Sequence, residues 1–392
     1  MNNKLRQLID SIAQPDGVAA SAASAHLDQL TKPPGSLGKL ESVAIQLAGI
    51  TGVDKPEFER KTVMVMAADH GVCEEGVSAF PAEVTQQMLY NMLSGGAAIN
   101  VLARHAGADV KVVDVGVNAD VAHANLVDRK VRMGTSNIAK GPAMLRTEAE
   151  QAVLAGAEAV AEAVKGGTRL FVTGELGIGN TTASAAVVCA LTGLEPEVIV
   201  GRGTGVDMAG LTRKISVVCR ALDVNQPDAN DALDVLTKVG GLEIAALAGV
   251  ILGAAAHRCP VVLDGFISGA AALAARALAP ASAVYMLASH ASDERGHAAV
   301  LRQLKLEPML HLDMRLGEGT GGALSLHLID AACRIMREMA TFADAGVSDG
   351  QGPRSDESAR DRRGTQREKR LCRAIMHVAR FARLLHCNGA SL

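Results

Sequence analysis

The 392-residue sequence contains no tryptophan, and aromatic residues make up only 2% of it, whereas glycine occurs 40 times. Without large rings to fill the space between elements, the helices must pack closely through alanine and glycine. Long apolar runs are also missing. The longest, residues 244–256, is too short to span a bilayer and predicts a buried helix. We therefore expect no dependence on a membrane.

Signals for secretion and disulfide formation are equally scarce. Residues 1–10, MNNKLRQLID, contain no apolar segment, so we expect no secretion signal and a cytoplasmic location. The seven cysteines are scattered and include no C-x-x-C pair, which is typical of reduced thiols in a cytosolic protein. A formal net charge of −3 gives no reason to expect nucleic-acid binding.

A repeated pattern of short apolar runs predicts the fold class. Each run ends in a glycine-rich or polar turn, and an alanine-rich helical pattern follows. The runs are residues 62–66, 110–113, 170–172, 198–200, 261–263, 284–287 and 309–312. Short buried runs alternating with helices predict an α/β fold, with a Rossmann-like parallel sheet and helices on both faces.

Polar residues follow these predicted strands. In an open parallel sheet, ligands bind outside the carboxyl ends of the strands. We therefore expect one crevice ringed by Asp69, Glu175, Arg202, Asp264, Ser289 and Glu318. The alternative is that these residues only form turns and helix caps, but Glu and Arg are not turn formers.

The two ends of the chain differ from this central region. Residues 1–41 and 329–347 have helical patterns and predict a small helical domain, which leaves residues 42–328 as the large α/β domain. Residues 348–392 begin as a polar, mixed-charge linker and then form a possible basic amphipathic helix at 371–385. Such a helix could bind a membrane surface or a partner, but we interpret this tail as an appendage unrelated to the chemistry.

Three glycine-rich loops carry candidate functional residues. Residues 174–182 (GELGIGNTT) follow a predicted strand and open a helix, so their backbone N–H groups could cradle a phosphate. Residues 201–205 (GRGTG) resemble a dinucleotide loop but have Val206 where a third glycine is needed. Lys214, beyond this loop, is either a phosphate ligand or a solvated helix lysine. The third loop, RLGEGTGG at 315–322, holds the single carboxylate Glu318.

Seven motifs in one order are those of a single family. They are residues 32–38 (KPPGSLG), 68–72 (ADHGV), 83–85 (EVT), 174–177 (GELG), 180–182 (NTT), 261–266 (VVLDGF) and 315–319 (RLGEG). From about Leu5 to Val347 the sequence resembles the nicotinate-nucleotide:dimethylbenzimidazole phosphoribosyltransferases, which make α-ribazole phosphate for the lower ligand of cobalamin. The resemblance implies an α/β domain, a small domain of terminal helices and a homodimer. Residues 348–392 depart from the family pattern.

The resemblance also implies residue roles. Glu318 matches the general base, and Glu175 and Asp264 match the other acidic residues of the site. Residues implied to bind the ribose phosphate are Gly177, Asn180, Thr181, Gly203, Lys214 and Ser292. Those implied to line the benzimidazole pocket are Ser78, Phe80, Gln87, Met88, Leu176 and Leu316.

A lone glutamate suits the reaction that the resemblance implies. The donor, nicotinate mononucleotide, has a cationic leaving group that departs without protonation. The acceptor, dimethylbenzimidazole, has an N–H that becomes acidic during attack, so one carboxylate is enough. An apolar neighbour such as Leu316 favours a raised pKa for Glu318. We expect no metal ion and no cofactor, because the histidines lack metal-ligand spacing.

Two other functions stay open from the sequence. The loop at 201–205 would fit a dinucleotide-dependent oxidoreductase, although the missing third glycine counts against it. A non-catalytic sensor on the same fold would bind nicotinate mononucleotide without releasing nicotinate. The preferred base among benzimidazoles, purines and phenolics is also left open.

Overall fold

The structure is a computed structural model that describes residues 1–203 and 205–348. Residues Met1–Ala343 form one compact unit. The predicted linker and amphipathic helix at 348–392 lie almost wholly outside the described residues. Within the described residues, no helix is both long enough and apolar enough to cross a membrane.

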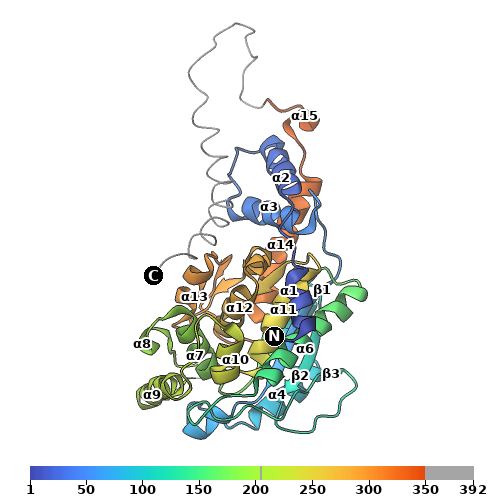
Figure 1. Cartoon of the computed structure of the whole chain (residues 1–392). Coiled ribbons are helices and arrows are strands. Elements are labelled where there is room, and N and C mark those ends of the chain that lie inside the picture. The colour runs from blue at the N-terminus through green and yellow to red at the C-terminus, as the bar shows by residue number, and fades with distance from the viewer. Residues whose placement is uncertain (204, 349–392) are drawn as a thin grey trace. The chain divides into compact units, whose positions relative to one another are not determined.

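A six-stranded parallel sheet forms the centre of this unit (Figure 1). The strand order is β3-β2-β1-β4-β5-β6, which confirms the predicted α/β class. The strands are β1 (Lys61–Ala68), β2 (Ala108–Gly116), β3 (Leu126–Asp128), β4 (Leu170–Leu176), β5 (Val261–Leu263) and β6 (Met286–Ala288). The order reverses between β1 and β4, so the loops after these two strands diverge and leave room for a ligand.

Side chains of the sheet alternate between two cores. Met64, Met66 and Phe171 face one core, and Val63 and Val65 face the other. Every residue of β1 and β4 is buried, as expected for central parallel strands covered on both faces.

Glycine and alanine let the helices of the first face approach very closely. A methyl group added at Gly156 of α6 would lie 1.9 Å from the carbonyl oxygen of Ala246 in α11. One added at Gly249 of α11 would lie 1.8 Å from the carbonyl oxygen of Val153. The close packing predicted from composition is therefore confirmed. Elements on this face are α1 (Asn3–Asp10), α6 (Arg146–Lys165), α7 (Asn180–Thr192), α8 (Pro196–Ile199), α9 (Met208–Asn225), α10 (Ala232–Val239), α11 (Leu242–Ala256), α12 (Phe266–Leu278) and α13 (His297–Leu304).

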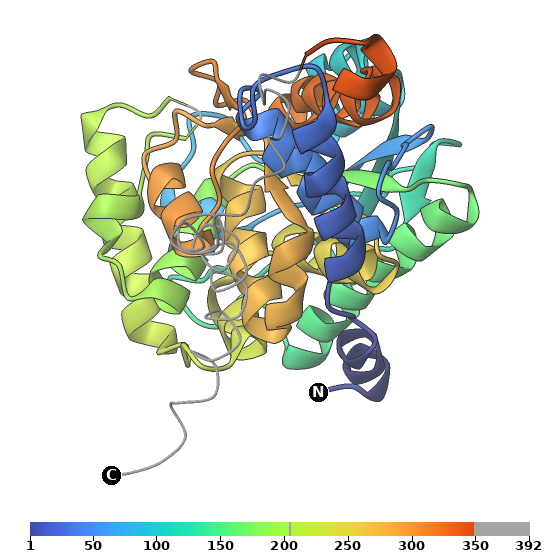
Figure 2. The same ribbon diagram turned by 90° about the horizontal axis from the view of Figure 1, so that it is seen from above.

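Helices α12, α7 and α9 pack in succession, with α9 (light green) outermost in the view from above (Figure 2). Those on the second face are α2 (Gly17–Gln29), α3 (Lys39–Thr51), α4 (Val84–Leu93), α5 (Ala98–His105) and α14 (Thr320–Glu338). Short elements of the unit are η1 (Gly71–Glu75), η2 (Pro280–Tyr285), β7 (His290–Ala291) and β8 (Leu310–His311). The short helix α15 (Phe342–Ala345) crosses the end of the unit at Ala343.

The terminal helices meet on the second face. In Figure 1, α2 and α3 (blue) lie beside the end of α14 (orange-red), and the imidazole Nε2 of His26 is 3.0 Å from the carbonyl oxygen of Met336. Thr31 N–H donates to the carbonyl oxygen of Ala340 at 3.1 Å. Helix α1 packs instead against α6 and α11. A separate small domain of residues 1–41 and 329–347 stays a prediction.

Two of the predicted strands are wrong in type or place. Residues 198–200 end the short helix α8, because Pro196 at its first position favours a helical start. Residues 309–312 contribute β8, which pairs only with β7 in a separate two-stranded sheet. The six-stranded sheet is therefore completed by β3, which the apolar pattern did not reveal.

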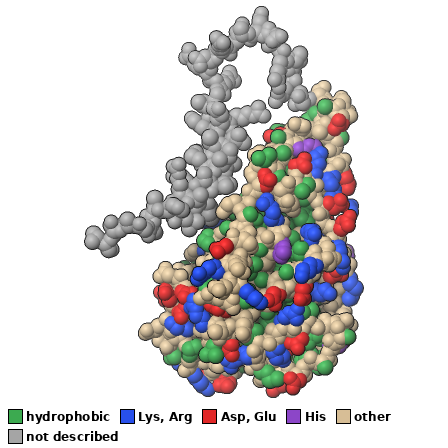
Figure 3. All heavy atoms as spheres, turned by 45° about the vertical axis from the view of Figure 1, so that its right-hand side comes forward, with side chains coloured by type: hydrophobic (Ala, Val, Ile, Leu, Met, Phe, Trp, Pro, Cys, Tyr) green, Lys and Arg blue, Asp and Glu red, His purple; other side chains and the backbone are tan. Residues whose placement is uncertain are grey.

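Acidic and basic side chains alternate on the surface. On the face shown in Figure 3, Lys and Arg are interspersed with Asp and Glu. This mixture agrees with the small formal net charge of −3.

Candidate active site

A cavity of about 650 Å³ opens at the carboxyl ends of β4 and β5. It brings together twelve of the residues singled out from the sequence: Ser78, Phe80, Met88, Glu175, Leu176, Gly177, Asn180, Thr181, Gly203, Ser292, Leu316 and Glu318. Six others do not line it: Asp69, Arg202, Asp264, Lys214, Gln87 and Ser289. This cavity is the candidate active site.

Of the three carboxyl groups Glu175, Asp264 and Glu318, only Glu318 has a buried oxygen without a hydrogen-bond partner among the described residues. Its side chain is buried, and the backbone N–H of Ile99, in the first turn of α5, bonds to it. Among the described residues, no hydrogen-bond partner reaches its Oε2. Burial raises the pKa of Glu318, and the charge of Asp264 adds to that rise, against the N–H of Ile99. The direction agrees with the sequence-based expectation, but its causes are burial and Asp264, and Oε2 keeps its hydrogen-bonding capacity free among the described residues.

The glycines around Glu318 are required by the backbone. Gly317 has φ = 86° and Gly319 has φ = 91°, a region that side chains disfavour, and Glu318 itself has φ = 61°. A methyl group at Gly317 would also lie 2.1 Å from Oε1 of Glu175. The loop therefore holds Glu318 in a strained conformation directly against the end of β4.

Glu175, near the end of β4, is a buried carboxyl of a different kind. Its Oε2 accepts a hydrogen bond from the amide of Asn180, and the backbone N–H of Glu318 also bonds to it. Burial is the largest influence and, with the nearby charges of Asp264 and Glu243, raises the pKa of Glu175 to about 8. At neutral pH this group is mostly protonated.

Asp264 lies outside the cavity lining and bonds to the backbone of the segment that follows Glu318. Its Oδ1 accepts the N–H of Gly322 at 3.0 Å, and its Oδ2 accepts that of Gly319 at 3.2 Å. Both donors belong to the start of α14, whose positive end favours an anion. Burial raises the pKa of Asp264 to about 6 against these hydrogen bonds. The carboxylate thus fixes the loop that carries Glu318.

Cationic groups gather at one side of the cavity. Lys214 of α9 is 1% exposed, and its Nζ donates to Oγ1 of Thr181 at 2.7 Å. A methyl group at Gly203 would lie 2.8 Å from that Nζ. Arg315 lines the cavity and donates to the carbonyl oxygen of Gly203 at 3.2 Å. Burial lowers the pKa of Lys214 to about 8, partly offset by Glu294. We call Lys214, Arg315 and the backbone N–H groups at the start of α7 the anion corner, because together they suit a bound anion.

The rest of the lining is largely apolar. Val77, Phe80, Val84, Met88, Leu176, Ile178 and Leu316 form this apolar wall. Ser78 lies among them and accepts the backbone N–H of Phe80 at 3.1 Å. Gln87 is exposed on α4, one residue before Met88, and therefore faces away from the cavity. The wall fits a flat apolar ring better than a polar one.

The predicted single crevice needs correction at four of its six positions, Asp69, Arg202, Asp264 and Ser289, because only Glu175 and Glu318 line the cavity. Asp69 lines a separate cavity with Glu83 and Asn118, because the loops that follow β1 and β4 diverge. Arg202 lines a neighbouring cavity together with Glu294. Ser289 is buried, with its Oγ 2.9 Å from Nδ1 of His290.

Sequence reasoning also missed residues that line the cavity. His290, Glu294, Arg315 and Phe266 are among them. His290 follows the predicted strand at 284–287, and Arg315 opens the motif at 315–319, so the sequence already marked both positions. The loop at 201–205 follows α8 rather than a strand, which removes the structural context of a dinucleotide fingerprint. Within residues 1–203 and 205–348, no group of three or more His, Cys, Asp or Glu side chains is placed to hold a metal ion.

Comparisons with known proteins identify the class of this site. A family model described as phosphoribosyltransferase matches residues 12–347. The chain is accordingly a phosphoribosyltransferase, an enzyme of the pentosyltransferase class. Relatives named nicotinate-nucleotide–dimethylbenzimidazole phosphoribosyltransferase include one from Chloroflexus aggregans, 59% identical over 88% of this chain and 98% of its own length. Another, from Roseiflexus sp., is 57% identical over 88% and 98%.

Solved structures agree. The crystal structure of the nicotinate-nucleotide–dimethylbenzimidazole phosphoribosyltransferase from Thermus thermophilus superposes with a TM-score of 0.82 at 50% identity. It covers 86% of this chain and 100% of that one. The chain belongs to the nicotinate-nucleotide–dimethylbenzimidazole phosphoribosyltransferase family.

Proposed function

We propose that the enzyme moves the 5-phosphoribosyl group of nicotinate mononucleotide to 5,6-dimethylbenzimidazole, releasing nicotinate and α-ribazole 5′-phosphate. This reaction belongs to assembly of the cobalamin nucleotide loop. We further propose inversion at the anomeric carbon, Glu318 as general base, and a cytoplasmic homodimer. The observation that carries the proposal is a buried carboxylate oxygen of Glu318, with no hydrogen-bond partner among the described residues, in a cavity with an apolar wall and an anion corner.

The bond changes need only one proton acceptor. The bond between the ribose carbon and the pyridinium nitrogen breaks, and its electron pair neutralises the ring. The bare nitrogen of the benzimidazole attacks the opposite face of the same carbon, so a β-nucleotide gives an α-product. The proton on its second nitrogen passes to Glu318 and then to solvent. General-base catalysis of this kind contributes about 10²–10⁴-fold.

The other carboxyl groups support this single-base scheme. Glu175, with a pKa of about 8, is mostly neutral at pH 7 and does not compete for the proton. Asp264 is engaged by two backbone N–H groups and acts on the reaction through the loop. Glycosidases, in contrast, need a second carboxyl group because their leaving group must be protonated.

The anion corner is the proposed seat of the nucleotide phosphate. Lys214 is fully buried, and its charge of +1 is offset only by Glu294 among the groups that shift its pKa. A phosphate beside Lys214 and Arg315 would satisfy these cations and receive N–H groups from the start of α7. Binding there would fix the sugar carbon for attack, which is a large source of rate.

The direct test is incubation with nicotinate mononucleotide and dimethylbenzimidazole, with products identified by mass and anomeric configuration. The proposal expects nicotinate and the α-anomer in equal amounts. Binding of the nucleotide without release of nicotinate would establish the sensor alternative instead. A β-anomeric product would overturn direct displacement.

A further inference from the structure

A buried pair outside the cavity lining, His70 and Glu243, has no role in the scheme above. Nε2 of His70 is 2.7 Å from Oε1 of Glu243, and the two residues are 4% and 0% exposed. His70 follows β1, and Glu243 lies in the first turn of α11. Burying two titratable groups costs free energy unless they are paired with good geometry. Packing alone therefore does not explain why two titratable side chains are buried here.

The imidazole ring of His70 is enclosed by two glycines. A methyl group at Gly241 would lie 2.4 Å from its Cε1 and 2.8 Å from Oε2 of Glu243. On the other side, a methyl group at Gly177 would lie 3.5 Å from both Nε2 and Cδ2 of the ring. The ring consequently lies directly behind the backbone of Gly177, and Gly177 lines the cavity.

Residues 177–179 are also supported by side chains on the side of the loop away from the cavity. The backbone N–H of Ile178 donates to Oγ1 of Thr85 at 3.1 Å, and Sγ of Cys73 donates to the carbonyl oxygen of Ile178 at 3.1 Å. A methyl group at Gly179 would lie 2.7 Å from that sulfur. At Gly177 the closest atom to an added methyl group is the carbonyl oxygen of Ala68, at 2.4 Å, with the His70 ring next. The side chains that support the loop, His70, Cys73 and Thr85, lie outside the cavity lining.

Electrostatics favour the same arrangement. Burial lowers the pKa of His70, but the charge and hydrogen bond of Glu243, with the charge of Asp69, outweigh it and leave the pKa raised. Cys73 also supports this loop, and burial, with the charge of Asp69, raises its pKa to about 11, so it stays a thiol. Glu243 keeps an Oε2 that no described residue bonds to, and its carboxylate is the main influence that raises the pKa of the neighbouring His70 ring.

We propose that His70 and Glu243 are positioning residues that fix the Gly177–Gly179 loop and thereby set how tightly the enzyme holds the phosphate end of its nucleotide. This rests on the proposed function in one respect, namely that the loop meets the phosphate and ribose. Neither residue touches the substrate. Their effect is on where the loop backbone N–H groups and the start of α7 point.

The test measures binding rather than turnover. Calorimetry on the full chain compares nicotinate mononucleotide with nicotinate riboside, which lacks the phosphate. His70→Ala is expected to raise the Kd for the mononucleotide about tenfold, with a much smaller change for the riboside. His70→Gln, whose amide can still donate to Glu243, is expected to restore most of that affinity. Tyr285→Phe, which loses a buried hydrogen bond to Ala13 far from the loop, is the matched control and should bind both ligands normally.

Two outcomes would overturn the inference. One is an unchanged Kd for the mononucleotide in folded His70→Ala. The other is an equal loss for both ligands, which would show general weakening of the fold. Should His70→Ala fail to fold, Glu243→Gln, which keeps a hydrogen-bonding group, gives the same comparison. Wild-type protein that binds the mononucleotide but forms no product would contradict the proposed function and leave this inference testable.

Discussion

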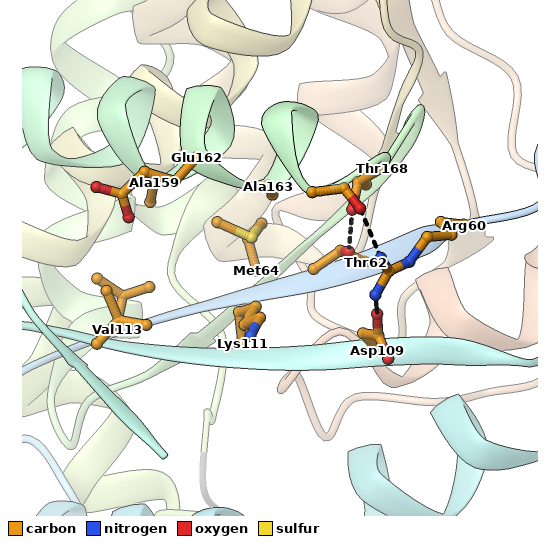
Figure 4. Close-up of a pocket in the computed structure, with 12 residues that line it drawn as sticks. Arg60, Thr62, Met64, Asp109, Lys111, Val113, Ala159, Glu162, Ala163 and Thr168 are labelled. Atoms are coloured by element: carbon orange, nitrogen blue, oxygen red, sulfur yellow. Dashed lines mark hydrogen bonds and ion pairs between the residues drawn. The ribbon is translucent and has the colours of Figure 1, made fainter. Parts of the chain in front are cut away.

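Two cavities at opposite ends of the strands of the same sheet show how a candidate active site differs from a cavity with no proposed ligand. The smaller, about 210 Å³, lies at the amino ends of β1 and β2 (Figure 4). There Arg60 bonds to Asp109 at 3.2 Å, and the hydroxyls of Thr62 and Thr168 are 2.9 Å apart. The dashed lines in Figure 4 join Arg60 to Asp109 and Thr62 to Thr168, whereas Glu162 bonds to Arg129 outside the lining.

The cavity at the carboxyl ends of the strands is different in kind. It contains Glu318 with an unpaired oxygen and Glu175 with a pKa of about 8, and Lys214, with a pKa of about 8, lies beside it. Groups with perturbed pKa values and open hydrogen-bonding capacity cluster at functional sites. The comparison indicates that buried polar atoms without hydrogen-bond partners, more than the number of polar residues, distinguish the candidate active site at the carboxyl ends of the strands.

The largest expected effect is at Glu318. Glu318→Gln keeps the shape of the loop but removes the proton acceptor, so kcat should fall about 10²–10⁴-fold with little change in nucleotide binding. Steady-state kinetics and calorimetry on the same preparation measure both. Near-normal turnover would remove Glu318 from the role of base.

Lys214→Ala is expected to act on binding. A lost charge-assisted hydrogen bond should raise KM for nicotinate mononucleotide about 10- to 100-fold and leave KM for dimethylbenzimidazole nearly unchanged. Initial rates with each substrate varied in turn measure the two constants. Equal increases in both constants would argue against a phosphate contact.

The pH dependence should report the same two groups. Glu318 must be ionised to accept a proton, so kcat should fall as the pH drops through a pKa above the ordinary value for glutamate. Lys214 loses its charge as the pH rises through about 8, so KM for the nucleotide should increase there. Rate profiles from pH 5 to about 9.5 would show both limbs. An alkaline rise in KM that persists in Lys214→Ala would assign it to another group.

At the amino edge the expected effect is on stability alone. Thr62→Val leaves the buried hydroxyl of Thr168 without its partner, which should cost about 1–3 kcal/mol in the free energy of unfolding. Denaturant unfolding measures this loss, and Thr62→Ser should retain the bond. Altered KM for either substrate would contradict the distinction between the two edges.

The smallest effect is expected from removing residues 348–392. The family model ends its match at residue 347, so the shortened protein should keep its activity. Kinetic constants of the two forms, measured side by side, provide the comparison. A folded but inactive protein would show that the tail contributes to catalysis.

Local patterns in the sequence predicted much of this architecture. Buried β-branched runs identified β1, β2, β4 and β5, because parallel strands covered on both faces need continuous apolar residues. Glycine-rich loops at strand ends located Glu175 and Glu318. The run at 198–200 failed because three apolar residues fit a helix end as well as a strand, and Pro196 decided between them.

Other features depended on contacts that no local pattern contains. Asp264 was expected at the ligand, but it bonds to the start of α14, whose approach to β5 is a tertiary arrangement. The surroundings of His70, beside Glu243, and of His290, in the cavity lining, depend on what faces their rings. Gln87 and Met88 are adjacent in sequence, yet only the helix orientation shows that Met88 faces the cavity.

Helix α14 begins at the loop of Glu318 and ends among α2 and α3. Its 19 residues make a rod about 28 Å long, anchored at one end by Asp264 and along its length by the bond between Lys61 and Asp330. We therefore expect mutations under the terminal helices to shift the start of α14 and, with it, the loop of Glu318. In directed evolution of the enzyme, rate-changing substitutions should appear there, far from any substrate atom.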